Sequence, residues 1–146
     1  MHLADEAATE AAGAMLAGVL QVGDVIALSG PLGAGKTCFA RGLIGALGFA
    51  GDVPSPTFGI VIPYAPPALR VPLWHVDLYR IDQLADLEEL GLDEARQDAA
   101  LIIEWPERMG AALWPDALRI DLTVDGNGRR LTVTVPPSWE ARWPFR

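Results

Sequence analysis

Eight consecutive residues near the start of the chain have the types and spacing of a phosphate-binding loop. Residues 30–37, GPLGAGKT, match the pattern G-x-x-x-x-G-K-[ST] in full. Glycines allow backbone N–H groups to curl toward phosphate oxygens. We expect Lys36 to reach the β- and γ-phosphates of a nucleotide and Thr37 to place its hydroxyl on Mg²⁺. A short apolar run precedes the loop and a helical pattern follows it, which is the context this motif requires.

Two acidic residues that follow apolar runs are candidates for a magnesium site beside this loop. Glu104 ends the run 99–103, and Asp77 follows the run 73–76. Both acids would lie at the carboxyl ends of strands, where open α/β sheets bind their ligands. We predict that Glu104 is a metal ligand and that Asp77 binds Mg²⁺ through water or orients the attacking water. Without the loop, a solvated strand end would explain either acid.

Several polar residues near these acids leave alternatives open. Ser55 and Thr57 could sense the γ-phosphate, as switch loops do, or form an ordinary turn. His75 would share the strand face of Asp77, and it belongs either to the site or to the core as a satisfied histidine. Arg80 could pair with Asp77 or with phosphate, or form a surface ion pair that adds little stability.

The charge balance narrows the classes of partner. The chain has 146 residues, with 19 acidic and 11 basic side chains and a formal net charge of -8, and Lys36 is the only lysine. Such an acidic chain has no broad basic surface for a phosphate backbone, so we do not expect direct binding to DNA or RNA. A single cysteine, acidic N-terminal residues and no apolar run near the roughly 20 residues of a membrane span predict a cytoplasmic location without membrane contact.

The motifs that the chain lacks favour ATP over GTP. Guanine-specific GTPases use Asn-Lys-x-Asp, whereas the only asparagine here, Asn127, precedes a glycine and there is no second lysine. Small-molecule kinases usually close an arginine-rich lid over the phosphates, and the middle of this chain is acidic instead. Three functions stay open on the residues alone: an ATPase that works as a subunit of a complex, a small-molecule kinase, and a nucleotide-gated binding module without significant turnover.

Hydrophobic periodicity predicts the elements that must hold these residues. Helical patterns cover 5–20 and 37–47, and an acidic, helix-prone stretch covers 82–98. Strands are expected at 25–28, 58–64, 71–79, 99–103, 119–124 and 131–135. The second and third of these form a hairpin or a short crossover, and the last two form a hairpin through Gly126-Asn127-Gly128. These elements predict one α/β domain with a mixed sheet over 1–138 and a loosely packed tail at 139–146.

Five segments, taken together, resemble one family, the small bacterial ATPases of tRNA threonylcarbamoyladenosine biosynthesis, TsaE. The matching segments are LGAGKT at 32–37, SPTF at 55–58, HVDLYR at 75–80, EELG at 88–91 and EWP at 104–106. Their order and spacing agree over about residues 3–135. The resemblance implies a P-loop NTPase-like three-layer sandwich with a mixed central sheet and a C-terminal β-hairpin.

The resemblance also implies roles for individual residues. Thr37 and Glu104 would hold Mg²⁺, and the catalytic residues would be Lys36, Asp77 and Glu104. Nucleotide contacts are implied for Leu3, Glu6, Gly33, Ala34, Gly35, Lys36, Thr37, Cys38, Thr57, Tyr79, Trp105 and Arg129. Pro31 replaces the aspartate that is usual in the family, and because proline has no N–H, this position donates no backbone hydrogen bond.

By the same resemblance, the protein serves a larger complex. Partners of the TsaD and TsaB type transfer a threonylcarbamoyl group to adenosine 37 of tRNAs that read ANN codons. ATP hydrolysis, slow and dependent on the partners, would drive the cycle of this complex without carrying out the transfer. We therefore expect contact with tRNA to be indirect, which agrees with the acidity of the chain.

Overall fold

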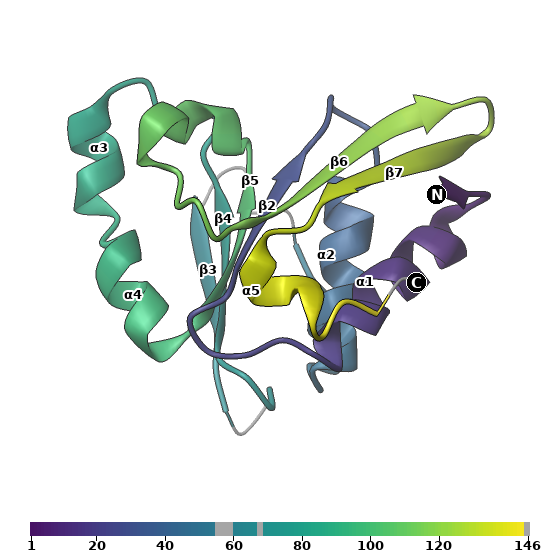
Figure 1. The fold of residues 1–146 in the computed structure, drawn as a ribbon, viewed down its shortest axis with the longest axis horizontal. Coiled ribbons are helices and arrows are strands. Elements are labelled where there is room, and N and C mark those ends of the chain that lie inside the picture. The colour runs from purple at the N-terminus through teal and green to yellow at the C-terminus, as the bar shows by residue number, and fades with distance from the viewer. Residues whose placement is uncertain (55–59, 67–68, 145–146) are drawn as a thin grey trace.

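The computed structural model describes residues 1–54, 60–66 and 69–144, which contain both helices and strands (Figure 1). The strands are β1 (His2–Leu3), β2 (Val25–Ser29), β3 (Val61–Tyr64), β4 (Leu73–Asp77), β5 (Ala100–Glu104), β6 (Leu118–Asp125) and β7 (Gly128–Thr134). The helices are α1 (Glu6–Ala17), α2 (Lys36–Ala46), α3 (Leu84–Glu89), α4 (Leu92–Asp98) and α5 (Pro137–Glu140), with a 3-10 helix, η1 (Pro106–Ala112). Each predicted strand has a counterpart in the structure.

The strands form one mixed sheet in the order β1-β7-β6-β2-β5-β4-β3. Strands β6, β2, β5 and β4 run parallel to their neighbours in the centre. The pairs β1–β7, β6–β7 and β3–β4 are antiparallel. The predicted mixed sheet and C-terminal hairpin are confirmed, and β3 and β4 are joined as a hairpin rather than as a crossover.

Helices cover both faces of the sheet, with α1 and α2 on one face and α3, α4 and η1 on the other (Figure 1). Ile26 and Ile102 are buried beneath α1 and α2, whereas Ala27 and Leu101 are buried beneath α3 and α4. This burial on both faces explains the unbroken apolar runs of the sequence. The predicted three-layer α/β fold is confirmed. Within the described residues, no helix is both long and apolar enough to cross a membrane.

Two glycines allow α1 and α2 to pack at very short range. A Cβ added to Gly13 would lie 2.1 Å from the carbonyl oxygen of Phe39, and one added to Gly42 would lie 1.9 Å from that of Glu10. A side chain at either position would therefore force the helices apart. Asp5 caps α1, since its Oδ1 accepts a backbone N–H of the first turn at 2.8 Å. This packing brings the start of α1 beside the start of α2, where the phosphate-binding loop ends.

The acidic stretch 82–98 forms two short helices rather than one. Gly91 separates α3 from α4 with a φ of +67°, a left-handed conformation that glycine adopts without strain and that ends a helix. The sequence pattern does not predict β1, η1 or α5. These elements are short or irregular, so they contain too few residues to show a periodicity.

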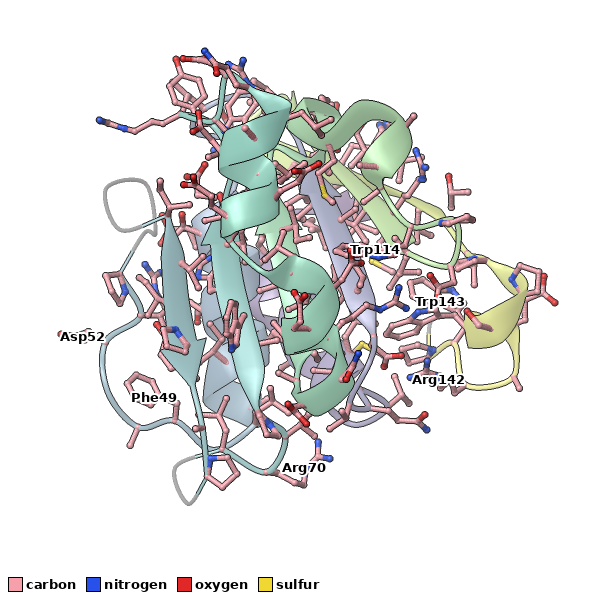
Figure 2. All side chains as sticks on the ribbon, turned by 90° about the vertical axis from the view of Figure 1, so that its left-hand side faces the viewer. Phe49, Asp52, Arg70, Trp114, Arg142 and Trp143 are labelled. Atoms are coloured by element: carbon pink, nitrogen blue, oxygen red, sulfur yellow. The ribbon has the colours of Figure 1, made fainter. Side chains whose placement is uncertain are left out.

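The described part of the C-terminal tail, residues 139–144, is packed onto the core, which corrects the expectation that the tail packs loosely. Trp139 is 1% exposed and belongs to the core on the α1–α2 side of the sheet. Arg142 lies 4.0 Å from the ring centroid of Trp139 and binds both carboxylate oxygens of Asp24 at 2.6 Å. Figure 2 shows the side chains of Arg142 and Trp143 between the ribbon of the tail and the rest of the molecule. The apolar and paired side chains of this segment explain its packing.

Removing the Arg142 side chain should destabilise the fold without affecting the nucleotide site. An Arg142→Leu substitution leaves the largely buried carboxylate of Asp24 without its bidentate partner. We expect the free energy of unfolding in urea to fall by about 1–3 kcal/mol. The matched control is Arg119→Leu, which removes the same charge from an exposed strand position and should change that free energy by no more than about 0.5 kcal/mol. Equal losses in the two variants would contradict this role.

Candidate functional site

The phosphate-binding loop connects β2 to α2 and has a curled backbone. Gly33 and Gly35 have φ values of +78° and +102°, in the left-handed region that favours glycine. The N–H of Ala34 donates to the carbonyl oxygen of Pro31 at 3.1 Å, which closes a turn within the loop. Because α2 begins at Lys36, its positive N-terminal end lies at the loop. Loop and helix together can offer backbone N–H donors to an anion.

A Gly35→Ala substitution should destabilise the loop through its backbone conformation. The added Cβ would meet no atom closer than 3.5 Å, so the cost comes from the φ of +102° and not from a clash. We expect the free energy of unfolding to fall by about 1–2 kcal/mol. The control is Gly45→Ala, at an exposed position in α2 with open space around it, which should gain about 0.5–1 kcal/mol. Urea unfolding of both variants measures this, and a shift of the same sign in both would contradict it.

A cleft of about 720 Å³ opens beside this loop and is lined by segments that are far apart in the sequence. Its walls come from the loop and the start of α2, the carboxyl ends of β4 and β5, the start of α1 and the β6–β7 turn. The lining residues are Ala4, Asp5, Glu6, Thr9, Leu32, Gly33, Gly35, Lys36, Thr37, Cys38, Arg41, Asp77, Tyr79, Glu104, Trp105, Asn127, Gly128 and Arg129. Three of the matching segments, the phosphate-binding loop, HVDLYR and EWP, thus contribute to one cavity.

Most of the described residues predicted to contact nucleotide or metal line this cleft, but Leu3 and Ala34 do not. Leu3 is 4% exposed, and Ala34 is fully buried, so both side chains belong to the core. β1 turns the Leu3 side chain inward, and nucleotide contact at Leu3 and Ala34 stays a prediction. Leu3 does pair with Arg129 in the register of β1 and β7, which ties the start of the chain to the hairpin. Thr57, with the rest of the predicted switch at 55–58, lies outside the described residues.

Lys36 is held at the base of the loop. Its side chain is buried, and Nζ donates to the carbonyl oxygen of Gly30 at 2.6 Å. The ammonium also lies 3.9 Å from the ring centroid of Trp105. Burial lowers the pKa of Lys36 from its ordinary value, while the charges of Glu104 and Asp77 act in the opposite direction. The lysine therefore lies close to both predicted acids.

Asp77 and Glu104 lie side by side at the carboxyl edge of the sheet. They are partners in the parallel register of β4 and β5, and both are nearly fully buried. Oδ1 of Asp77 accepts the backbone N–H of Tyr79 at 2.8 Å. Oε2 of Glu104 lies 2.7 Å from Nε2 of His75, which is fully buried. The carboxylates thus have fixed positions beside Lys36.

Trp105 has a backbone conformation that is rare for an aromatic residue. Its φ of 60° and ψ of 50° lie in the left-handed region, directly before Pro106. Strain of this kind is concentrated at functional sites, where the surrounding structure maintains it. The ring lies 4.9 Å from that of Tyr79, between centroids, and covers the ammonium of Lys36. The strained turn therefore places the ring of Trp105 beside the phosphate-binding loop.

The β6–β7 hairpin reaches the opposite side of the loop through Arg129. Its Nη2 donates to the carbonyl oxygen of Gly33 at 3.0 Å, and Nη1 donates to that of Gly128 at 2.9 Å. Thr9, Arg41 and Asn127 also line the cleft, and reasoning from the sequence missed all three. None of them belongs to a local motif, so only the packing of α1, α2 and the hairpin reveals them.

The donors suited to a magnesium ion are hard oxygen atoms at the cleft. Thr37 and Glu104, the predicted ligands, both line it, with Asp77 beside them. A hydroxyl and a carboxylate fit Mg²⁺, which usually completes its coordination with phosphate oxygens and water. Among the described residues, no group of three or more His, Cys, Asp or Glu side chains could hold a metal ion. The hydroxyl of Thr37 and the carboxylate of Glu104 fit a cation that is bound together with a nucleotide.

The chain is similar to proteins of one family in both sequence and fold. Residues 3–132 match the family described as threonylcarbamoyl adenosine biosynthesis protein TsaE. The tRNA threonylcarbamoyladenosine biosynthesis protein TsaE of Streptomyces coelicolor is 44% identical over 130 residues, 84% of this chain and 86% of that one. The protein of the same name from Treponema pallidum is 38% identical over 124 residues, 83% and 89% of the two chains. The crystal structure of Bacillus subtilis YdiB has a TM-score of 0.81 and 28% identity, covering 97% of this chain and 88% of that one.

Proposed function

Because the chain belongs to the TsaE family of threonylcarbamoyl adenosine biosynthesis proteins, we propose that it is a Mg²⁺-dependent ATPase of this pathway. The family links it to the biosynthesis of threonylcarbamoyladenosine in tRNA, the process that its relatives are named for. One observation carries the ATPase proposal: the curled loop, a buried lysine and two buried carboxylates line the same cleft. These are the parts that phosphoryl-transfer sites share.

The loop binds the phosphates of ATP in this proposal. Backbone N–H groups at Gly33 and Gly35 and the N-terminal end of α2 bind the phosphate oxygens. Lys36 leaves the carbonyl oxygen of Gly30 and binds the β- and γ-phosphates as a point charge. Cleft walls at Trp105 and Tyr79 exclude water from the lysine.

The two acids have separate tasks beside the γ-phosphate. Thr37 and Glu104 hold Mg²⁺, which neutralises negative charge on the phosphates during transfer. Asp77 orients the attacking water, because its carboxylate lines the cleft and Oδ1 is fixed by the N–H of Tyr79. The products of this reaction are ADP and inorganic phosphate.

The ATPase acts as a subunit rather than alone in this proposal. Its partners are the TsaD- and TsaB-type proteins that carry out threonylcarbamoyl transfer, and the tRNA binds mainly to them. The net charge of -8 supports binding of the tRNA by the partners, since an acidic chain repels a phosphate backbone. Hydrolysis would then drive the cycle of the complex.

Phosphate release from ATP, measured with and without the partners and tRNA, tests this function. We expect slow release by the chain alone and faster release with the partner proteins. No change on adding partners and tRNA would contradict the subunit role. Turnover that requires a small-molecule acceptor would indicate a kinase, and binding of ATP without turnover in the full mixture would indicate a nucleotide-gated binding module.

A further inference from the structure

A buried histidine contacts Glu104 from the neighbouring strand. His75 lies on β4 and is fully buried, and its Nε2 is 2.7 Å from Oε2 of Glu104. In the register of β4 and β5, His75 is opposite Ile102 and Asp77 is opposite Glu104. Side chains alternate along a strand, so His75, Asp77 and Glu104 share the face that carries the phosphate-binding loop.

The hydrogen-bonding pattern determines which nitrogen of His75 carries the proton. An ionised carboxylate only accepts hydrogen bonds, so Nε2 must be the donor to Glu104. Among the described residues, Nδ1 of His75 has no hydrogen-bond partner. The hydrogen bond therefore runs from Nε2–H of His75 to Oε2 of Glu104.

This arrangement does not fit a histidine that serves only the core. A core histidine would have both nitrogens paired, whereas within the described part of the chain Nδ1 of this ring, in an apolar layer, has no partner. An apolar residue would fill the same space without that cost. The bond to Glu104 is thus the feature of His75 that an apolar residue could not supply.

We propose that His75 is a positioning residue for Glu104, holding its carboxylate in the orientation in which it binds Mg²⁺. This inference rests on the proposed function. A glutamate side chain has three rotatable bonds, and the bond to a buried imidazole selects one of its rotamers. The carboxylate has about four lone-pair sites, so a bond to Oε2 leaves acceptor capacity for a cation. Hydrogen bonds of this kind to metal-binding side chains usually tune metal affinity.

The test compares two variants of His75 in the intact chain. His75→Leu removes the donor but fills the space, whereas His75→Gln keeps an N–H donor at a similar distance. Binding of a non-hydrolysable ATP analogue is measured by calorimetry over a series of Mg²⁺ concentrations, independently of turnover. We expect His75→Leu to raise the Mg²⁺ concentration for half-saturation by about 10–100-fold. His75→Gln should recover most of that loss.

A control on the same strand separates positioning from loss of stability. Val76 is also fully buried but faces the opposite side of the sheet, so Val76→Ala should lower the urea midpoint and leave the Mg²⁺ requirement unchanged. If wild type requires Mg²⁺ and His75→Leu has the same half-saturation, the positioning role is overturned and the ATPase proposal stands. The positioning role is also overturned, and the ATPase proposal also stands, if Val76→Ala raises the Mg²⁺ concentration for half-saturation as much as His75→Leu does. If wild-type binding does not respond to Mg²⁺, the proposed function fails and this inference fails with it.

Discussion

A Lys36→Ala variant is expected to lose ATP turnover, with kcat/KM at least about 10³-fold below wild type. Lys36 is the only lysine of the chain, so no other ammonium group can replace it at the phosphates. Its Nζ lies on the carbonyl oxygen of Gly30, within the loop itself. Steady-state phosphate release and calorimetry with a non-hydrolysable ATP analogue measure the loss of turnover and of binding separately.

The fold should survive this substitution. Burial lowers the pKa of Lys36, which means that the folded state carries the charge at a cost. Removing the side chain relieves this cost and loses one hydrogen bond and one contact with Trp105. We expect the two effects to offset each other to within about 1 kcal/mol in the free energy of unfolding. A folded variant with wild-type ATP affinity and turnover would refute the assignment of the loop.

The centre of the site could be predicted because its parts are local in the sequence. The loop is contiguous, and its glycines and lysine define its chemistry without reference to distant residues. Asp77 and Glu104 each follow a buried run, and parallel strands end at the same edge of a sheet. The sequence does not reveal that the two strands are neighbours, since a helical segment separates them along the chain.

The rim of the cleft depends on packing that no local pattern encodes. Thr9 reaches the loop because Gly13 and Gly42 allow α1 and α2 to approach each other closely. Asn127 reaches it because the β6–β7 hairpin extends over the loop, and its neighbour Arg129 was indicated only by family resemblance. These positions are determined by tertiary contacts, so composition and periodicity do not reveal them.

Two residues with positive φ differ in whether their type predicts that conformation. Gly91 ends α3 with a positive φ, and because glycine accepts this conformation readily, the break in the acidic stretch was available to sequence reasoning. Trp105 adopts a similar φ although its side chain disfavours it. Such a strained residue is maintained by its surroundings, here Lys36 and Tyr79, and it cannot be inferred from its own type.

Replacing Glu104 with glutamine should remove most of the Mg²⁺-dependent turnover while keeping the fold. The substitution removes the negative charge but keeps the size and an oxygen that accepts from Nε2 of His75. The loss of a charged ligand leaves Mg²⁺ weakly held, and we expect kcat to fall by about 10²–10³-fold. Turnover measured against Mg²⁺ concentration should also show a much higher half-saturation value.

An acid of the same type outside the cleft provides the control for this loss. Glu94 is exposed on α4, so Glu94→Gln makes the same chemical change without touching the site and should keep wild-type turnover. If Glu104→Gln kept the wild-type Mg²⁺ dependence, the ligand role would move to Asp77, its register partner at the same sheet edge. An Asp77→Asn variant would then be expected to show the higher Mg²⁺ half-saturation value that Glu104→Gln lacks. Comparison of the two isosteric variants therefore assigns the metal ligand to one of the two strands.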